Sequence, residues 1–450
     1  MSNARQVAER VLSRVWGSDA FAAAVLDAEI GRMAGMDPRD GALATELVYG
    51  VLRTQQALES RLLGLTKTGR IDLPEAARAH LLMAAYSICF LDRIPTFAAV
   101  NEAVSGIAAT GDARAASFAN AILRKLATTI DTEGRPSLSE AVAASAPGWL
   151  RGALRRSLGR REAEAYLAAG PVPPPIGLSL RMNEDRAAWM SELRKACPDA
   201  SFEPGKASPR AILVRGAGDV RRLAGAGKAW IVQEEGAQVV ALALGARTGD
   251  RVLDACAGRG NKTWILADAV GQTGAVDAAD LYASKLERLR ETPFGQSVRQ
   301  TFAVDWSIEN PTGAIPPHDY DRVLVDAPCS GTGTLRRRPE IALHRSADDV
   351  TRLSELQTAI VRNAALHVKP QGKLVYAVCS VLREESENVV EKLVEKPLDN
   401  GMTLAPAAFD SDILRSLAPE GATTMRLLPH VQGTDGYFLA NFEVKPRGCT

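Results

Sequence analysis

Two cysteines end strand candidates in the second half of this sequence of 450 residues. Cys329 closes the run Asp326-Ala-Pro-Cys329, and Cys379 closes the apolar strand candidate 372–379. A lone cysteine is usually a small buried hydrophobic residue, but a thiolate whose pKa is lowered is a strong nucleophile. A disulfide between the two cysteines is the alternative, which a reducing compartment disfavours. We therefore expect nucleophilic chemistry at this pair of strand ends.

Acidic residues occupy the other strand ends. The strand candidates 251–255, 275–280, 300–305 and 321–326 carry acids at or near their ends, namely Asp254, Asp280, Asp305 and Asp326. In open α/β sheets, ligands bind beyond the carboxyl ends of the strands, so these ends predict a single site. The alternative for Asp280 is a helix cap before Tyr282.

A glycine bend after the first of these strands limits the type of nucleotide ligand. Gly258-Arg-Gly260 is followed by Thr263 where the dinucleotide fingerprint needs a third glycine, and the first glycine of a P-loop is also missing. NAD is therefore disfavoured. A nucleoside-type ligand remains, and acids at the ends of the second and third strands suit the ribose and adenine of S-adenosylmethionine.

The elements that must position these residues divide the chain into three parts. Residues 1–135 carry apolar residues at helical spacing, interrupted by breaks such as Asp37-Pro38, which predicts an all-α domain. Residues 136–230 mix helical segments with two short strand candidates and predict a small α+β module. Residues 231–450 alternate strands with helices, which is typical of a parallel, doubly wound, Rossmann-like α/β sheet.

Composition and charge limit the class of protein. Lys and Arg number 54, and Asp and Glu number 53, so no whole-molecule field draws the chain to nucleic acid or membrane. The longest nearly apolar stretch, 81–91, is shorter than the ~20 residues that span a bilayer and predicts a buried core helix. The six cysteines form no CxxC pair, and no uninterrupted apolar run opens the chain. We expect a cytoplasmic protein with no metal site and no membrane attachment.

Local basic segments are candidate surfaces for a polyanion. Residues 151–161 contain five arginines in eleven positions, and Arg336, Arg337 and Arg338 follow the Cys329 run. Each set fits either a solvated charged face or a surface that contacts RNA phosphates.

The motifs around both cysteines resemble those of a known family. The run 326–333, with 337–341 after it, resembles motif IV of the Sun (RsmB) family of RNA cytosine carbon-5 methyltransferases. The runs 374–381 and 384–388 resemble motif VI of the same family.

The resemblance extends toward the N-terminus. Residues 46–53, 93–95 and 119–124 are similar to the NusB-like RNA-binding domain of the bacterial members, and Leu180-Arg-Met-Asn183 is similar to their intermediate module. The resemblance therefore implies a NusB-like helical domain (1–135), a small α+β module (136–230) and a class I methyltransferase domain (231–450).

The resemblance also implies an activity. The methyl group of S-adenosylmethionine is transferred to carbon-5 of a cytosine in RNA, most simply in small-subunit (16S) rRNA, either naked or in a partly assembled subunit. The target base has to be unstacked to expose carbon-6. The resemblance implies no metal and no membrane partner, and we expect a monomer.

Roles for individual residues follow from the matching motif positions. The resemblance implies that Cys379 attacks carbon-6, that Cys329 assists release of the product, and that Asp326 and Lys262 contact the base. It implies that the cofactor is held by Cys256, Ala257, Gly258, Arg259, Gly260, Asn261, Lys262, Asp280, Asp305 and Asp326. Arg259 and Asn261 depart from the family motif, which has proline and glycine at these places.

Two other functions remain as alternatives. A non-catalytic RNA-binding protein, built on the helical domain and the arginines, would bind RNA without methyl transfer. A nicotinamide-dependent oxidoreductase shares the fold class, but it would need the third glycine that this bend lacks.

Overall fold

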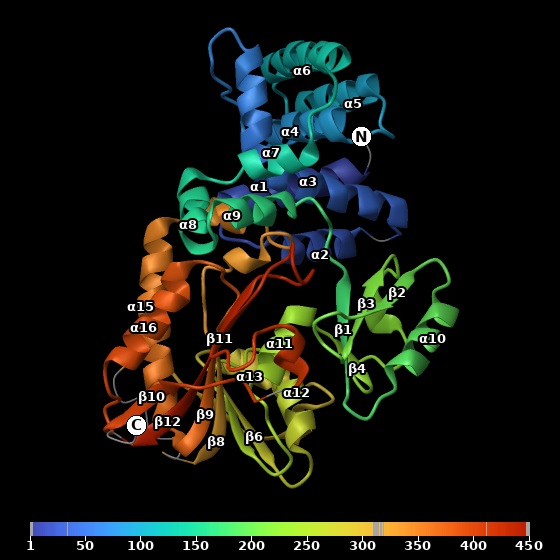
Figure 1. Ribbon diagram of the computed structural model, residues 1–450. Coiled ribbons are helices and arrows are strands. Elements are labelled where there is room, and N and C mark those ends of the chain that lie inside the picture. Colours follow the sequence, from blue (N-terminus) through green and yellow to red (C-terminus); the bar gives the residue numbers. More distant parts are fainter. Residues whose placement is uncertain are drawn as a thin grey trace. The chain divides into compact units, whose positions relative to one another are not determined.

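The protein forms two compact units in the computed structural model, which describes residues 3–33, 35–308, 315, 317, 319–410 and 412–446. The first unit comprises Met1–Arg155, Gly159–Pro173 and Leu335–Arg345. The second comprises Arg156–Leu158, Pro174–Thr334 and Ser346–Thr450. Figure 1 shows helices throughout the first unit and sheets with flanking helices in the second.

The first unit is helical, as the sequence predicts. Its helices are α1 (Asn3–Gly17), α2 (Ala22–Arg32), α3 (Pro38–Leu65), α4 (Glu75–Phe90), α5 (Thr96–Ala109), α6 (Ala113–Glu133), α7 (Leu138–Ala144), α8 (Gly148–Leu158), α9 (Arg160–Ala168) and α14 (Ile341–His344). The last three residues of α8 belong to the second unit.

Local signals in the sequence set the helix boundaries of the first unit. Asp37 caps α3 by accepting a hydrogen bond from the Arg39 amide, and Pro38 opens the helix. Gly134 ends α6 with a positive φ of 86°, which a side chain would disfavour. Helix α4 lies in the middle of the apolar core, so the prediction of a buried core helix at 81–91 is confirmed.

An eleven-residue segment that follows the Cys329 turn belongs to the helical unit. Arg53 Nη2 donates to the backbone oxygen of Arg336 at 2.7 Å, and Glu340 Oε1 accepts from the Ala22 amide at 3.0 Å. Leu343 packs against the apolar core of the helices. Neither hydropathy nor spacing predicts this insertion, because the sequence places the segment deep inside the α/β region.

The second unit contains two sheets. The smaller sheet has the order β2-β3-β1-β4 and is antiparallel throughout, with β1 (Ile176–Leu180), β2 (Ser201–Pro204), β3 (Ala211–Arg215), β4 (Trp230–Val232) and helix α10 (Arg186–Ala196). The larger sheet is built from β5 (Arg251–Asp254), β6 (Ala275–Asp280), β7 (Val298–Ala303), β8 (Tyr320–Asp326), β9 (Val368–Val378), β10 (Met402–Pro406), β11 (Thr424–Leu427) and β12 (Tyr437–Pro446).

The larger sheet has the order β10-β12-β9-β8-β5-β6-β7, with β11 paired to β12. Strands β7, β6, β5, β8 and β9 are parallel, whereas β12 runs antiparallel to β9 and β10 antiparallel to β12. The expectation of a parallel sheet is therefore wrong at this edge. A hydrophobic run such as 437–444 carries no signal for strand direction, which depends on the path of the preceding chain.

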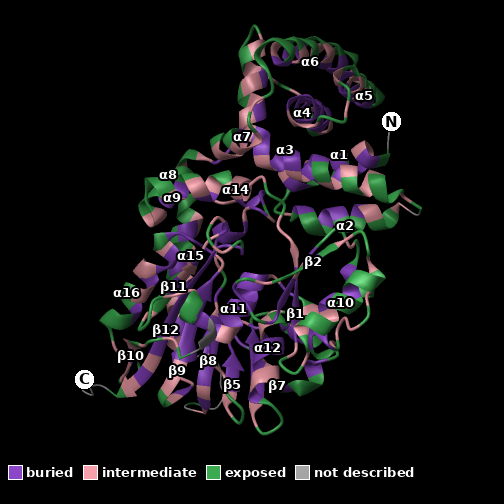
Figure 2. Ribbon diagram, turned by 45° about the vertical axis from the view of Figure 1, so that its right-hand side comes forward, coloured by how far each residue is buried: buried purple, intermediate pink, exposed green. Residues whose placement is uncertain are grey.

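Helices cover both faces of the parallel strands. Helices α11 (Glu235–Ala243), α12 (Asn261–Val270) and α13 (Ala283–Arg290) pack on one face, and α15 (Ala347–Ala365) and α16 (Glu387–Glu395) on the other. Figure 2 shows the strands of this sheet as mostly buried. The predicted doubly wound α/β layer is confirmed, and α15 starts at Ala347, where Ser346 and Asp349 form a capping box.

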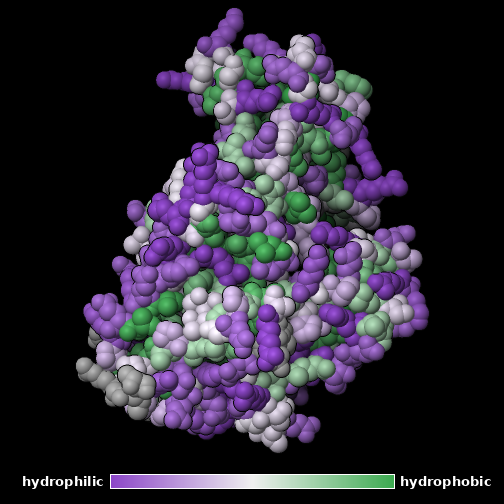
Figure 3. All heavy atoms as spheres, in the orientation of Figure 1, coloured by the Kyte–Doolittle hydropathy of each residue, from purple (hydrophilic) through white to green (hydrophobic). Residues whose placement is uncertain are grey.

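The surface in Figure 3 is mostly hydrophilic, with small hydrophobic areas between charged residues. Among the described residues, no helix combines the length and the apolar composition needed to cross a membrane. The three-part division at residues 135 and 230 stays a prediction.

Close packing of α3 against α4 predicts that substituting one glycine of α3 lowers stability, whereas substituting another does not. A Cβ on Gly50 would lie 2.1 Å from Cζ of Tyr86, so Gly50→Ala should lower the free energy of unfolding by ~1–3 kcal/mol. A Cβ on Gly41 of the same helix would meet nothing within 4 Å, so Gly41→Ala should leave stability unchanged or raise it by up to ~1 kcal/mol. Urea denaturation followed by circular dichroism measures both, and equal effects would contradict the packing.

Candidate active site

The order of the parallel strands brings the predicted strand ends together. The chain turns from β5 toward β6 and β7 on one side, and later returns to place β8 and β9 on the other. Asp254 at the end of β5 pairs with Leu324 of β8, and Asp326 at the end of β8 pairs with Ala377 of β9. This reversal of strand order is where open α/β sheets bind ligands.

The loop between β5 and α12 is held by backbone and side-chain hydrogen bonds. The Ala257 amide donates to the Ala279 oxygen at 2.8 Å, and Trp306 Nε1 donates to the Ala255 oxygen at 2.7 Å. Gly260 caps α12 with φ of 87°, and a Cβ there would lie 2.8 Å from Cγ of Leu289. Glycine is therefore required at 260, both for its conformation and for the close approach of α13.

The residues around this loop fit the predicted cofactor, S-adenosylmethionine. Asp280 Oδ2 accepts from the Gly258 amide at 3.0 Å, and a Cβ on Gly258 would meet nothing within 4 Å, so this side of the loop is open. Leu281 and Tyr282, next along the chain, are 53% and 56% exposed, which leaves apolar surface for a flat base. Arg259 is exposed, so its difference from the family motif leaves the buried side of the loop unchanged.

The two acids predicted to bind the nucleoside differ in surroundings. Asp280 is buried, and its Oδ1 accepts from the Tyr282 amide at 2.9 Å; because Tyr282 is itself the N-cap residue of α13 and the helix has no side-chain cap, this bond is not the helix cap of the alternative. Asp305 lies two residues beyond the end of β7, where its Oδ1 accepts from the Ser307 amide at 2.9 Å. The cofactor-binding roles of both residues stay predictions.

A cluster of two carboxyl groups and one ammonium group, of which only Asp254 is fully buried, lies at the ends of β5 and β8. Lys262 Nζ donates to Asp326 Oδ2 at 2.5 Å. Burial alone would lower the pKa of Lys262, but the Asp326 carboxylate outweighs it and holds the pKa above its usual value. Lys262 is therefore cationic at neutral pH.

Asp254, one of the strand-end acids of the sequence, received no role from the family motifs, although it stands two positions before Cys256. It is fully buried, and its Oδ2 accepts from Thr263 Oγ1 at 2.7 Å. Its Oδ1 has no hydrogen-bond partner in the described part of the chain. Burial raises the pKa of Asp254 to about 7, and the Thr263 bond opposes this only in part.

The two predicted cysteines meet. The Sγ atoms of Cys329 and Cys379 lie 3.2 Å apart, and both thiols are free, so the disulfide alternative is not realised. The contact with Cys379 and burial raise the pKa of Cys329 well above its usual value, and the charge of Glu385 adds to this. Burial likewise raises the pKa of Cys256, so that thiol also stays protonated.

Close backbone packing fixes the turn after Cys329. The Gly333 amide donates to the Cys379 oxygen at 2.9 Å, and the Gly436 amide donates to the Gly333 oxygen at 2.7 Å. A Cβ on Gly333 would lie 2.0 Å from the Gly436 oxygen, so no other residue fits at 333. The two cysteine segments and the segment around Gly436 are thereby joined.

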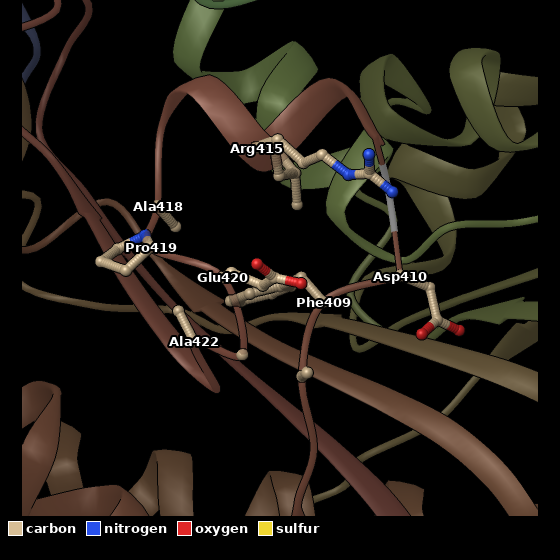
Figure 4. A pocket seen from close by; sticks show the side chains of 10 residues that line it. Phe409, Asp410, Arg415, Ala418, Pro419, Glu420 and Ala422 are labelled. Carbon is tan, nitrogen blue, oxygen red and sulfur yellow. The ribbon is translucent and has the colours of Figure 1, made fainter.

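The second unit also contains a large cavity that is separate from the predicted site. A cavity of about 670 Å³ is lined by residues 408–410, 414, 415 and 418–422, and Figure 4 shows Arg415, Glu420 and Phe409 around it. None of the predicted site residues lines this cavity. Within the described ranges, no group of three or more His, Cys, Asp or Glu could hold a metal ion.

The raised pKa of Asp254 predicts a pH-dependent stability difference. Because the folded chain holds this proton more tightly than the unfolded chain, the contribution of Asp254 should be lost as pH rises from about 4 to about 7. The free energy of unfolding of the wild type should therefore fall relative to Asp254→Asn over this range. Hydrogen bonds from Ser307 lower the pKa of Asp305, so the stability difference between the wild type and Asp305→Asn should stay constant over this range and change only in acid, where Asp305 becomes protonated. Parallel pH curves for wild type and Asp254→Asn, from chemical denaturation, would refute the assignment.

Comparison with known proteins agrees with this geometry. Residues 241–443 match the model of the 16S rRNA methyltransferase RsmB/F family, and residues 2–128 match the NusB family. Ribosomal RNA small subunit methyltransferase B of Xanthomonas campestris pv. campestris is 31% identical, over 97% of this chain and 96% of its own length. The same enzyme of Pseudomonas putida is 30% identical, over 97% and 98%.

Solved structures show the same fold. The crystal structure of PH0851 has a TM-score of 0.75 and 22% identity, covering 98% of each chain. NSun6 from Pyrococcus horikoshii with SFG has a TM-score of 0.51 and 16% identity, covering 66% of this chain and 98% of its own. With its helical NusB-like part, its class I methyltransferase sheet and relatives that match it over nearly their whole length, this chain belongs to the RsmB family of ribosomal RNA small subunit methyltransferases.

Proposed function

We propose that this protein methylates carbon-5 of a cytosine in small-subunit rRNA through a covalent bond between Cys379 and the base. S-adenosylmethionine is the cofactor of the family and supplies the methyl group. The observation that carries the proposal is the 3.2 Å contact between the Cys329 and Cys379 sulfur atoms, beside the Lys262–Asp326 pair. Two thiols in contact at the carboxyl ends of adjacent parallel strands suit a reaction that needs both a nucleophile and a proton carrier.

The first step is attack on the base. Carbon-5 of cytosine is a poor nucleophile, and addition of the Cys379 sulfur to carbon-6 makes it enamine-like. The sulfur–carbon bond forms as the ring double bond opens, and negative charge develops on the ring. Asp326 accepts from the amino group of the base, and the cationic Lys262 stabilises the developing charge.

The last step is release. After methyl transfer, water accepts the carbon-5 proton, the electron pair of that C–H bond re-forms the ring double bond, and the bond to Cys379 breaks with its electron pair returning to the sulfur as a thiolate. The family motif assigns assistance of this step to Cys329. Before attack, the raised pKa keeps Cys329 a thiol, which leaves Cys379 as the better nucleophile of the pair.

Surface arginines support RNA as the substrate. Arg151, Arg155, Arg156, Arg160 and Arg161 are all exposed on α8 and α9. Several of them pair with acids, as Arg156 does with Glu384 at 2.9 Å, but ion pairs at an exposed surface are weak and RNA phosphates can compete for them. The second candidate surface is smaller than the sequence suggests, because Arg336 is buried and only Arg338 of its run is exposed.

The proposal includes the surroundings in which the reaction occurs. We propose a cytoplasmic monomer that acts on naked rRNA or on a partly assembled small subunit, with domain boundaries near residues 135 and 230. Free thiols at 329 and 379 suit a reducing compartment. A purely RNA-binding protein gives no reason for two thiols in contact beside the Lys262–Asp326 ion pair.

The two cysteines should fail differently when each is replaced. Cys379→Ala removes the nucleophile, so methylation should fall by roughly 10³-fold or more, with no covalent RNA adduct. Cys329→Ala blocks the last step, so methylated RNA should stay bound to Cys379 and run as a slow band on a denaturing gel. Methyl label from the cofactor should appear in that band, and the double variant should show no band.

Cys197→Ala serves as the control, because Cys197 lies at the end of α10 among residues that no step uses. It should methylate as the wild type does. An adduct in Cys379→Ala that is absent from Cys329→Ala would reverse the two roles.

Binding of the cofactor should depend on Asp280. Asp280→Ala should weaken binding of S-adenosylhomocysteine by ~1.5–3 kcal/mol, or about 10–150-fold, as expected for hydrogen bonds to a charged group. Asp280→Asn keeps an acceptor for the Gly258 amide and should lose less. Calorimetry measures both, with the exposed Asp399→Ala as control; no heat from the wild type at millimolar ligand would contradict the cofactor assignment.

A further inference from the structure

A buried carboxylate that no step of the proposed reaction uses lies behind the Cys329 turn. Glu385 ends the short helix η4 (Arg383–Glu385) and is fully buried. Its Oε1 accepts from the Ser330 amide at 2.8 Å and its Oε2 from Ser330 Oγ at 2.5 Å. A buried carboxylate is costly unless hydrogen bonds satisfy it, and here both oxygens bond to the residue that follows Cys329.

Gln357 of α15 connects Glu385 to the residue that precedes Cys329. Its Nε2 donates to Glu385 Oε1 at 2.9 Å and lies 3.0 Å from the Pro328 oxygen. Tyr376 of β9 donates its hydroxyl to the Glu385 backbone oxygen at 2.7 Å. The residues before and after Cys329 are therefore both tied to the same buried group.

The network continues to the second cysteine. Ser330 Oγ lies 3.4 Å from Ser380 Oγ, and Thr332 Oγ1 lies 3.0 Å from the same atom. Ser380 follows Cys379, and its Oγ also accepts from the Leu382 amide at 3.2 Å. Glu385 thus bonds directly to one cysteine turn and, through Ser330, reaches the other.

We propose that Glu385 is the positioning residue that holds the two cysteine turns in register, so that Cys329 meets Cys379. The proposal rests on the proposed function, because the register of the thiols matters for turnover only if both act on one base. Glu385 touches neither sulfur, so it acts through Ser330. Misplacing a reacting group by ~1 Å can cost roughly 100-fold in rate. Precise placement of Cys329 can therefore offset the free-energy cost of burying the Glu385 carboxylate.

The first experiment measures the distance between the thiols without RNA. The oxidant diamide takes two electrons and two protons from a pair of neighbouring thiols and leaves a disulfide, which peptide mass spectrometry detects. The wild type should join Cys329 to Cys379. Glu385→Ala should form this bond at least roughly tenfold more slowly, since the turn that carries Cys329 is no longer held.

Conservative and neighbouring variants separate positioning from folding. Glu385→Gln keeps an acceptor for the Ser330 amide and should restore most of the cross-linking rate. Glu384→Ala removes the adjacent carboxylate, which pairs with Arg156 instead, and should cross-link as the wild type does. Ser330→Ala removes only the hydroxyl contact and offers a milder break if Glu385→Ala does not fold. Binding of S-adenosylhomocysteine reports whether each variant has its sheet intact.

The second experiment uses unmethylated small-subunit rRNA transcribed in vitro. Glu385→Ala should accumulate the slow-migrating adduct as Cys329→Ala does, although Cys329 is present, and Glu385→Gln should turn over. If Glu385→Ala folds and forms the disulfide at the wild-type rate, the positioning role is overturned, whatever the RNA assay gives. If Glu385→Ala does not fold, the same outcome in a folded Ser330→Ala overturns it. If Glu385→Ala forms the disulfide slowly but methylates RNA at the wild-type rate, the positioning role is supported. The proposed function is then contradicted, because the register of the thiols does not matter for turnover.

Discussion

Three parallel strands whose carboxyl ends lie side by side are the constraint on which the site depends. Strands β5, β8 and β9 are neighbours in the sheet although they are far apart in the chain. Neighbouring strands lie only ~4.8 Å apart, so side chains at their ends must interact. The Lys262–Asp326 pair and the contact between the two thiols both follow from this adjacency.

Burial then decides which of these groups carries a proton. Asp254 is fully buried, and the Lys262–Asp326 ion pair lies beside it. Lys262 keeps its charge beside Asp326, while the pKa of Asp254 rises to about 7. The raised pKa of Cys329 belongs to the same pattern. When the Cys379 sulfur attacks, negative charge develops on the cytosine ring, and the cationic Lys262 can stabilise it. The neighbouring Cys329 stays a neutral thiol and does not compete for the cytosine.

A segment close in sequence to the site residues belongs to the helical unit rather than to the α/β unit. The turn after Cys329 ends at Thr334, and the next eleven residues pack in the helical unit before the chain returns at Ser346. Arg336 is consequently buried, and its backbone oxygen accepts from Arg53. A run of three arginines that looks like a solvated or RNA-facing surface thus exposes less charge than it suggests, because a local sequence pattern does not tell which unit a segment joins.

The sequence by itself determined what depends on neighbouring residues. Caps such as Asp37-Pro38 and Gly134 mark helix ends because hydrogen bonds and φ are local properties, and the alternation of strands and helices after 231 indicates the fold class. The residue types at the strand ends were also visible: two cysteines, several acids and a glycine bend.

Only the tertiary structure decided what depends on residues distant in the chain. The antiparallel edge strand β12, the insertion at 335–345 and the buried Glu385 behind Ser330 leave no periodic signal, since each is set by which elements become neighbours. The 3.2 Å contact between Cys329 and Cys379 joins residues fifty positions apart. Side-chain pattern specifies each strand, but strand order and direction come from packing the whole sheet, and that order is what brings the two sulfur atoms together.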